Sequence, residues 1–237
     1  MLDITKIRAI TLDLDDTLWP IWPTIAHAET VLQDWLRGRA PRTSALFADP
    51  VARLALRQDV MAARPDLQHQ LSSLRLEQIR LALSRSDEKT ALAEAAFEVF
   101  FDARQQVTLF DDVHAGLAFL SARFPLVALS NGNADLTRVG LSGYFKDSIS
   151  AQGFGVGKPD PRIFKAAASA AGVMPEEVLH IGDDAALDVL GALACGMQTV
   201  WVNREDHVWT HEAEPHETVT TLTELTALFL TFKSETP

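Results

Sequence analysis

Closely spaced carboxylates near the N-terminus are the first residues that could do chemistry. Residues 13–17 read DLDDT and end an apolar, β-branched run at residues 7–13 (IRAITLD). An apolar run that ends in acids predicts a buried strand followed by a turn. A carboxylate at this point can attack phosphorus and form an aspartyl-phosphate, which divides one difficult displacement into two easier ones. Asp13 is therefore the candidate nucleophile.

Hydrolysis of a phosphate ester also needs a proton donor for the leaving group and a cation to meet the charge. Asp15 stands two residues after Asp13, and a carboxyl group there can protonate the alkoxide and later take a proton from water. Because carboxylate and phosphate repel each other, a hard dication must lie between them, and Mg²⁺ prefers one or two carboxylates with substrate oxygen and water. Asp13 and Asp183 are the expected carboxylate ligands.

Further polar residues lie where other predicted strands end or the next helix begins. They are Ser130 with Asn131 and Gly132, then Lys158, and then Asp183. Reactive groups of open parallel sheets gather at the carboxyl ends of the strands. The Lys158 ammonium, the Ser130 hydroxyl and nearby backbone N–H groups can bind the phosphoryl oxygens as charge spreads over them. Each segment alone is typical of a turn or a helix cap, but the whole set in this order favours a catalytic site.

Helices and strands alternate in the second half of the chain. Apolar runs predict strands at 126–130, near Ile149, at 178–181 and at 199–202, and helices at 112–123, from Pro161 and at 185–195. This order is typical of a parallel sheet with helices on both faces, an α/β fold. The acidic stretch 205–217 (EDHVWTHEAEPHE) predicts a surface loop.

An all-helical block separates the first predicted strand from the rest. From Pro23 to about Gln106 apolar residues recur at helical spacing, and no strand pattern interrupts them. Helix starts are indicated near Ile25 and at 49–50, 65–66 and 86–87, where a capping residue or a proline precedes an apolar stretch. The block is expected to be a bundle of four helices, inserted as a lid over the edge of the sheet.

Composition limits the partners and the compartment. The 237 residues are 47% hydrophobic and 22% charged, as in ordinary globular proteins, and 21 basic against 32 acidic residues give a net charge of −11. This charge argues against nucleic acid or an anionic membrane as partner. Cys195 is the only cysteine, the first residues lack the order of a secretory signal, and no apolar run could span a bilayer. A cytoplasmic protein with a small-molecule partner, monomeric or homodimeric, is expected.

The chain resembles the haloacid dehalogenase superfamily of phosphotransferases, whose first motif is Asp-x-Asp-x-Thr. The four motifs match residues 13–18 (DLDDTL), 129–133 (LSNGN), 158–161 (KPDP) and 180–184 (HIGDD). The resemblance implies a Rossmann-like core of residues 1–20 and 108–237 and an inserted helical cap of the first type at residues 21–107. It also implies that Mg²⁺ is bound by Asp13, the backbone carbonyl of Asp15 and Asp183. Thr17, Asp184 and Asp188 are then expected behind these ligands.

Within the superfamily, the segments around Asp13, Asn131 and Asp183 look most like phosphatases of flavin mononucleotide and of phosphorylated ribitylaminouracil. Trp19 and Trp22 follow the reactive turn and are candidates for contact with a flat ring of the substrate. Four arginines of the predicted cap could contact a polar substrate: Arg53, Arg57, Arg75 and Arg80. Core packing or exposure on a solvated helix face explains most such residues.

Two other functions fit the same fold. A 2-haloacid dehalogenase displaces halide from carbon without a metal or a proton donor, so the second Asp of the first motif is dispensable there; Asp15 is present here, which favours phosphate chemistry. A binding module without catalytic activity would be free to lose Asp13, Asp15 or Lys158. All three residues are present, which favours an active enzyme.

Overall fold

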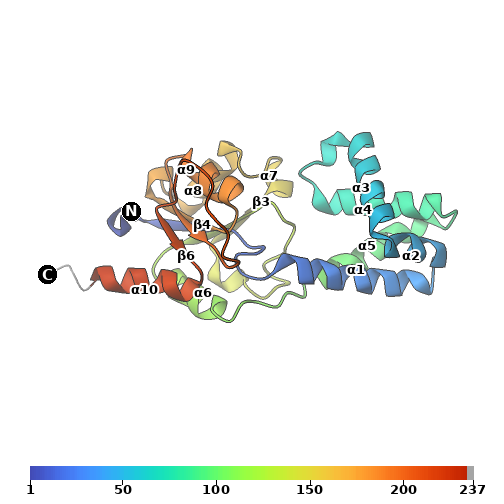
Figure 1. Ribbon diagram of the computed structural model, residues 1–237, viewed down its shortest axis with the longest axis horizontal. Helices are drawn as coiled ribbons and strands as arrows, with labels where there is room; N and C mark the ends of the chain where they lie inside the picture. The colour runs from blue at the N-terminus through green and yellow to red at the C-terminus, as the bar shows by residue number, and fades with distance from the viewer. Residues whose placement is uncertain (234–237) are drawn as a thin grey trace. The chain divides into compact units, whose positions relative to one another are not determined.

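A computed structural model describes residues 1–233 and divides them into two compact units (Figure 1). The catalytic unit contains residues 1–20, 109–132 and the chain from residue 140 onward. The cap unit contains residues 21–108 and also the short segment 133–139.

A six-stranded parallel sheet forms the centre of the catalytic unit. The strand order is β3-β2-β1-β4-β5-β6. The strands are β1 (Ala9–Leu12), β2 (Leu126–Ser130), β3 (Asp147–Ser150), β4 (Val178–Gly182), β5 (Gln198–Val202) and β6 (Glu217–Val219). Every residue of β1, β2, β4 and β5 is buried, which explains why these strands are mostly apolar and show no polar alternation.

Helices cover both faces of this sheet. On one face α8 and α9 pack with residues of β1, β2 and β4 around Phe164, and on the other face α6 packs against α10 (Figure 1). The helices are α6 (Val113–Ser121), α7 (Ala151–Phe154), α8 (Pro161–Ala171), α9 (Gly191–Leu193) and α10 (Leu222–Lys233). The α/β fold class with a Rossmann-like sheet is thereby confirmed.

Three features of the catalytic unit differ from the sequence prediction. The helix expected at 185–195 is a π-helical turn at Ala185–Leu190 followed by the single turn α9. The expected loop at 205–217 lacks regular structure through residue 216, but Glu217 begins β6. The helix α10 was not predicted, because the long polar stretch before it gives no clear signal of where regular structure begins again.

The cap unit is all helical around its own apolar core. Its helices are α1 (Ile21–Arg37), α2 (Pro41–Ala48), α3 (Pro50–Ala63), α4 (Leu71–Arg85) and α5 (Ala93–Arg104). Four of them have twelve residues or more, and α2 is a short addition. Helices α1, α2, α4 and α5 bury a common core that includes Leu36, Phe47, Ile79 and Phe100.

The predicted helix starts in the cap are only partly correct. Asp49 caps α3 as expected, because its side chain accepts a hydrogen bond from Val51 N. At Pro65 the chain makes only a 3-10 turn, Pro65–Leu67, and α4 begins six residues later. Residues 86–87 end α4, where Asp87 has a φ of 51°, and α5 begins only after the 3-10 turn Thr90–Leu92.

Helix α2 was missed because its cap comes from far along the chain. Ala40 at its start has no capping side chain. Instead the Glu88 carboxylate accepts hydrogen bonds from the backbone N–H groups of Arg42 and Thr43, at 3.1 and 2.8 Å. A contact over 45 residues leaves no local pattern in the sequence.

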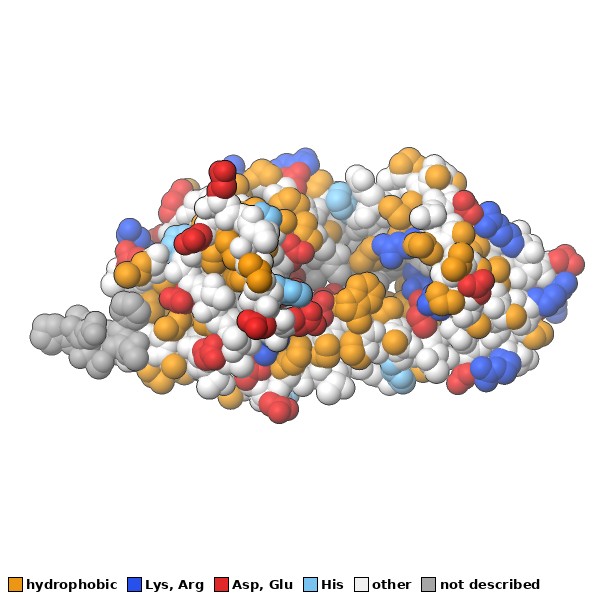
Figure 2. All heavy atoms as spheres, in the orientation of Figure 1, with side chains coloured by type: hydrophobic (Ala, Val, Ile, Leu, Met, Phe, Trp, Pro, Cys, Tyr) orange, Lys and Arg blue, Asp and Glu red, His pale blue; other side chains and the backbone are white. Residues whose placement is uncertain are grey.

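The surface carries charges of both signs. On the face drawn in Figure 2, Lys and Arg side chains are interspersed with Asp and Glu, and no continuous basic surface covers that face. Among the described residues, no helix combines the length and the apolar composition needed to cross a bilayer.

Candidate active site

The parallel register of the sheet brings the predicted site residues to one edge. Leu12, the last residue of β1, pairs with Ala128 of β2 and Ile181 of β4. Asp13 continues this edge, because its backbone N–H donates to the Ile181 carbonyl at 2.9 Å. The residues that follow β2 and β4 therefore flank Asp13.

The DLDDT segment folds as a tight turn that holds two carboxylates. Leu18 N donates to Leu14 O at 2.8 Å, and Asp16 takes a left-handed backbone with φ of 58°, a region that Asp tolerates better than most residues. The Thr17 hydroxyl lies between the acids, 3.0 Å from Asp183 Oδ1 and 3.5 Å from Asp13 Oδ2. Thr17 thus ties the first motif to the fourth.

Asp15 is fixed by a buried indole and lies against the loop after β2. Trp19 is fully buried, and its Nε1–H donates to Asp15 Oδ1 at 2.9 Å. A methyl group at Gly132 would lie 2.3 Å from Asp15 Oδ2, so only glycine leaves room for this carboxylate. The burial of Trp19 corrects the predicted substrate contact: its indole positions Asp15. Trp22 is 76% exposed, and its role stays a prediction.

The loops after β2 and before α8 are bonded to each other. Asn131 Nδ2 donates to the Lys158 carbonyl at 2.9 Å, and Lys158 N donates to Asn131 Oδ1 at 2.7 Å. Gly132 N donates to Ser130 Oγ at 2.9 Å. This pairing holds the Ser130 hydroxyl and the Lys158 side chain to the same part of the site.

Lys158 forms a buried ion pair with two carboxylates. Its Nζ lies 2.5 Å from Asp13 Oδ1 and 2.5 Å from Asp188 Oδ1, and its side chain is almost fully buried. Burial acts to lower the pKa of Lys158, but the Asp13 and Asp188 carboxylates outweigh it and raise the pKa above the usual value. The ammonium is therefore charged at any physiological pH.

Asp188 connects this ion pair to the core of the sheet. Its carboxylate accepts from Lys158, from His180 Nε2 at 3.0 Å and from Asp184 N at 3.1 Å. Thr11 Oγ1 lies 2.8 Å from the other ring nitrogen of His180. Burial acts to raise the pKa of Asp188, but Lys158 and His180 lower it to about 2.

Asp13, Asp183 and Asp188 form the acidic cluster that could hold a metal ion. One carboxylate oxygen from each lies within 4.8 Å of the other two. Burial raises the pKa of Asp183 to about 7, and the Asp188 carboxylate adds to the effect. Burial likewise raises the pKa of Asp13 well above its usual value, although Lys158 opposes it. A dication would relieve this crowding, so the donor set fits a hard, oxygen-loving cation.

Comparison with known proteins agrees with this geometry. The family model described as haloacid dehalogenase-like hydrolase matches residues 7–196. The chain belongs to the haloacid dehalogenase-like hydrolases.

Three similar proteins illustrate the range of the family. The 5-amino-6-(5-phospho-D-ribitylamino)uracil phosphatase YigB of Escherichia coli is 32% identical over 94% of this chain and 96% of its own length. A phosphoserine phosphatase of Thermus thermophilus is 32% identical over 88% of this chain and 94% of its own. A structure of a 2-haloacid dehalogenase from Pseudomonas syringae is 35% identical, covers 95% of this chain and 99% of its own, and has a TM-score of 0.88.

In this hydrolase the structure brings the predicted residues together, but it gives Asp184 and Asp188 roles different from each other. Asp184, expected behind the metal ligands, caps the π-helical turn by accepting from Ala186 N and Leu187 N. Asp188, expected in the same role, is the buried acceptor for Lys158. The alternation of helices and strands in the sequence predicted where these two residues lie. Their different roles became visible only in the contacts that Asp188 makes with distant residues.

Two residues that sequence reasoning missed hold the backbone of the site. Trp201 Nε1 donates to the Asp183 carbonyl at 2.6 Å, and Arg204 Nε donates to the Thr17 carbonyl at 3.0 Å. Arg204 is itself paired with Asp112 at 3.1 Å. Trp201 lies within β5 and Arg204 two residues after its end, so their place at the carboxyl end of a strand was the one available signal.

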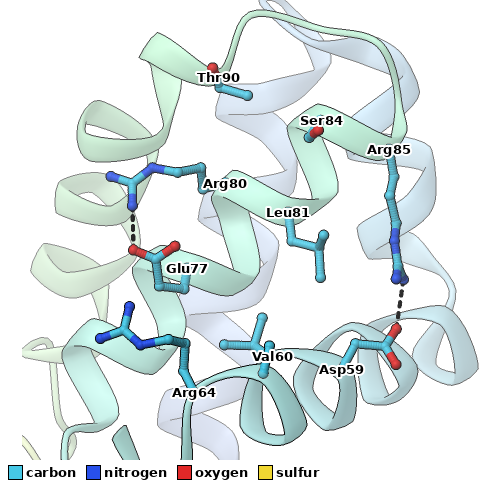
Figure 3. Close-up of a pocket in the computed structure, with 10 residues that line it drawn as sticks. Asp59, Val60, Arg64, Glu77, Arg80, Leu81, Ser84, Arg85 and Thr90 are labelled. Atoms are coloured by element: carbon cyan, nitrogen blue, oxygen red, sulfur yellow. Dashed lines mark hydrogen bonds and ion pairs between the residues drawn. The ribbon is translucent and has the colours of Figure 1, made fainter. Parts of the chain in front are cut away.

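A groove of about 550 Å³ lies in the cap unit of the hydrolase (Figure 3). It lies between α3 and α4 on an apolar floor that includes Val60 and Leu81. Its arginines already have acidic partners: Arg64 is bonded to Asp66, Arg80 to Glu77 and Glu94, and Arg85 to Asp59. The groove thus offers little unbalanced positive charge to an anion.

Proposed function

We propose that this hydrolase is a Mg²⁺-dependent phosphatase that cleaves a small-molecule phosphate monoester through an aspartyl-phosphate on Asp13. The observation that carries the proposal is the ordered Asp15 carboxylate, bonded to Trp19 and packed against Gly132. Dehalogenation needs no carboxyl group there, whereas hydrolysis of a phosphate ester needs an acid and base beside the nucleophile. The phosphatase-named relatives support the assignment.

The first chemical step is assigned to Asp13 and Lys158. Lys158 Nζ, 2.5 Å from Asp13 Oδ1, favours the charged form of Asp13 against the effect of burial and fixes its orientation. Asp13 Oδ2, whose hydrogen bond from Thr17 is long at 3.5 Å, is the oxygen that we assign to attack on phosphorus. The bond to the ester oxygen breaks as the Asp13–phosphorus bond forms, and the ammonium meets charge on the transferred oxygens.

The proton transfers are assigned to Asp15. Its carboxyl group gives a proton to the leaving alkoxide and then takes one from the water that hydrolyses the aspartyl-phosphate. The Ser130 hydroxyl and the backbone N–H groups of Asn131 and Gly132 are assigned to the phosphoryl oxygens, because they lie on the loop that Asn131 ties to Lys158.

Asp13, Asp183 and the backbone carbonyl of Asp15 are the proposed metal ligands. Asp188 is excluded from this set because its carboxylate already accepts from three donors. When bound, Mg²⁺ supplies positive charge that offsets the repulsion between the acids and the phosphate.

The substrate is proposed to be flavin mononucleotide or a phosphorylated precursor of riboflavin. The likeness of residues 180–184 to such phosphatases and the name of the E. coli relative support this choice. A panel of phosphorylated metabolites with flavin mononucleotide, phosphoserine and sugar phosphates tests it through the ranking of kcat/KM.

The dehalogenase alternative has a specific observation in its favour, the likeness to the Pseudomonas syringae structure. Release of phosphate from p-nitrophenyl phosphate and of chloride from chloroacetate, each with Mg²⁺ or with EDTA, separates the two reactions. We expect Mg²⁺-dependent phosphate release and no chloride. Release of chloride in the presence of EDTA would contradict the phosphatase assignment.

The silent-module alternative is tested by Asp13→Asn. We expect this variant to lose turnover while its Tm stays near that of the wild type or rises, because Asp13 is one of several crowded acids. Undiminished turnover in the variant would refute Asp13 as nucleophile.

A further inference from the structure

His180 is a buried titratable residue to which the proposed reaction gives no role. It lies in the middle of β4, between Leu179 and Ile181, and is 1% exposed. Burial lowers the pKa of its imidazole, although the Asp188 carboxylate opposes this effect. A neutral imidazole donates through one ring nitrogen and accepts through the other. The partners of the two nitrogens therefore decide which tautomer is present.

Both nitrogens of this ring have partners that favour one tautomer. His180 Nε2 lies 3.0 Å from Asp188 Oδ1, and an ionised carboxylate can only accept. On the other side of the ring the Thr11 hydroxyl lies 2.8 Å from Nδ1 and can donate to it. His180 thus carries its proton on Nε2 and donates it to Asp188. Thr11 is the direct partner of His180 in the β1–β4 pairing, so the register of the sheet itself brings the hydroxyl to the ring.

The contacts of His180 close a ring that returns to the nucleophile. Asp188 Oδ1 accepts from His180 and also from Lys158. The Lys158 ammonium in turn lies 2.5 Å from Asp13 Oδ1. Thr11, at the other end of this series of contacts, is two residues before Asp13, so the two side chains lie on the same face of the sheet. The imidazole is thus bonded into the group that holds the nucleophile, and is more than a packed side chain of the core.

Backbone groups hold only one side of the Asp188 carboxylate. Its Oδ2 accepts from Asp184 N at 3.1 Å, and a methyl group at Gly182 would lie 2.4 Å from its Cγ. Both contacts act on Oδ2 or on the carbon that bears it. Within the part of the chain that the structure describes, the donors to Oδ1 are Lys158 and His180. The Nε2–H of His180 therefore orients the oxygen that meets the lysine.

The orientation of this oxygen matters because it helps to aim the Lys158 ammonium. An ammonium has three N–H donors, of which Asp13 Oδ1 and Asp188 Oδ1 take two. With two directions fixed, the third N–H has one direction left and can meet an oxygen of the transferred phosphoryl group. An Asp188 carboxylate that turned away would leave two N–H groups of Lys158 without a fixed direction.

We propose that His180 is a positioning residue for phosphoryl transfer, because its Nε2–H holds Asp188 where Asp188 aims the Lys158 ammonium. Thr11 supports this role by keeping the proton of the imidazole on Nε2. The inference rests on the proposed function, since it concerns the lysine assigned to the first chemical step. His180 does not touch the reacting atoms, so its removal should lower turnover and leave the binding of the ester almost unchanged.

The first test compares two amides at position 180. The side-chain nitrogen of glutamine can take the place of Nε2, whereas the shorter asparagine reaches only the place of Nδ1. With p-nitrophenyl phosphate and Mg²⁺, His180→Asn should lower kcat by at least about tenfold, as expected for the loss of a hydrogen bond to a charged group, and change KM by less than about twofold. His180→Gln should restore kcat to within about threefold of the wild type. Equal losses of kcat in the two variants would assign His180 to packing and overturn the proposal, as would an unchanged kcat in His180→Asn.

A second pair of variants acts on Thr11 and decides the question even if His180→Asn does not fold. Thr11→Val keeps the shape of the side chain but removes the hydroxyl, so kcat should fall by about fivefold. Thr11→Ser keeps the hydroxyl and should restore kcat. Equal kcat values in these two variants would overturn the proposal. Thr199 and His216 form a similar pair at 3.3 Å outside this ring of contacts, so His216→Asn is the control and should leave kcat unchanged.

Direct observation of the tautomer is the third test. In NMR spectra of ¹⁵N-labelled protein at pH 7, the imidazole signals that disappear in His180→Gln should show a protonated Nε2 in the wild type. An Nε2 without a proton would overturn the proposal, because it could not donate to Asp188. Absence of Mg²⁺-dependent phosphate release from the wild type would instead refute the proposed function, whatever the tautomer of His180.

Discussion

Replacement of Asp183 by Asn should stabilise the metal-free protein at alkaline pH. Burial and Asp188 raise the pKa of Asp183 from 3.8 to about 7. A group whose pKa is raised in the folded state contributes stability that is fully present below pH 3.8 and is lost as the pH rises through 7. The loss amounts to at most about 4 kcal/mol, from roughly three pKa units at 1.36 kcal/mol each. Asparagine cannot ionise, and its side-chain oxygen can still accept from Thr17.

The assay is thermal unfolding in EDTA at pH 5 and at pH 8.5, followed by addition of Mg²⁺. Asp183→Asn should exceed the wild-type Tm by several degrees at pH 8.5, since each kcal/mol moves Tm by about 2–4 °C in a chain of this size. At pH 5, where Asp183 is protonated in the folded wild type but already ionised in the unfolded chain, the difference should be less than half as large, about 1.6 kcal/mol. Mg²⁺ should raise Tm of the wild type but not of the variant. Asp184→Asn, which keeps a helix-capping side chain, is the control.

A lower Tm for Asp183→Asn than for the wild type in EDTA at pH 8.5 would refute the reasoning. That result would mean that the Asp183 carboxylate stabilises the fold by hydrogen bonds more than its burial and its acidic neighbours destabilise it.

The remaining predictions concern the neighbours of the reactive carboxylates. Gly132→Ala should lower kcat by about a hundredfold, because its methyl group would displace Asp15 Oδ2; Gly143→Ala, with nothing within 4 Å, should retain full activity in the same phosphate-release assay. Trp19→Phe removes the donor to Asp15 and should lower kcat/KM by about tenfold with little change in Tm. Asp188→Asn should lower the free energy of unfolding in urea at pH 7 by about 2 kcal/mol, since the pKa of Asp188 falls from 3.8 to about 2 on folding. That contribution is present above pH 3.8 and is lost as the pH falls through 2, so the wild type and the variant should converge in acid.

The parallel sheet could be predicted because its strands are buried on both faces. The run before Asp13 and the run 126–129 are mostly apolar and stop at polar residues, so the sequence marks both the strand and its carboxyl end. The site followed from the same signal, since the residues after such strands must share one edge of the sheet.

The remaining features depend on contacts between distant residues. Segment 133–139 packs with the cap because Arg104 Nε donates to Asn133 Oδ1 at 2.9 Å and Arg138 pairs with Asp102 at 2.5 Å. No local pattern reveals such bonds. The π-helical turn before α9 could not be predicted either, because Asp188 within it bonds to Lys158 and to His180 of β4, which are distant from its own helix.

The buried hydrogen bonds also restrict which group can move protons. Lys158 stays charged because its two carboxylate partners raise its pKa, so it cannot act as an acid near neutral pH. His180 has both ring nitrogens occupied, one by Thr11 and the other by Asp188. Asp188 is held ionised, with a pKa of about 2. The proton donor that phosphate hydrolysis requires is therefore best sought in Asp15, whose carboxylate lies against Gly132 and is positioned by the Trp19 indole.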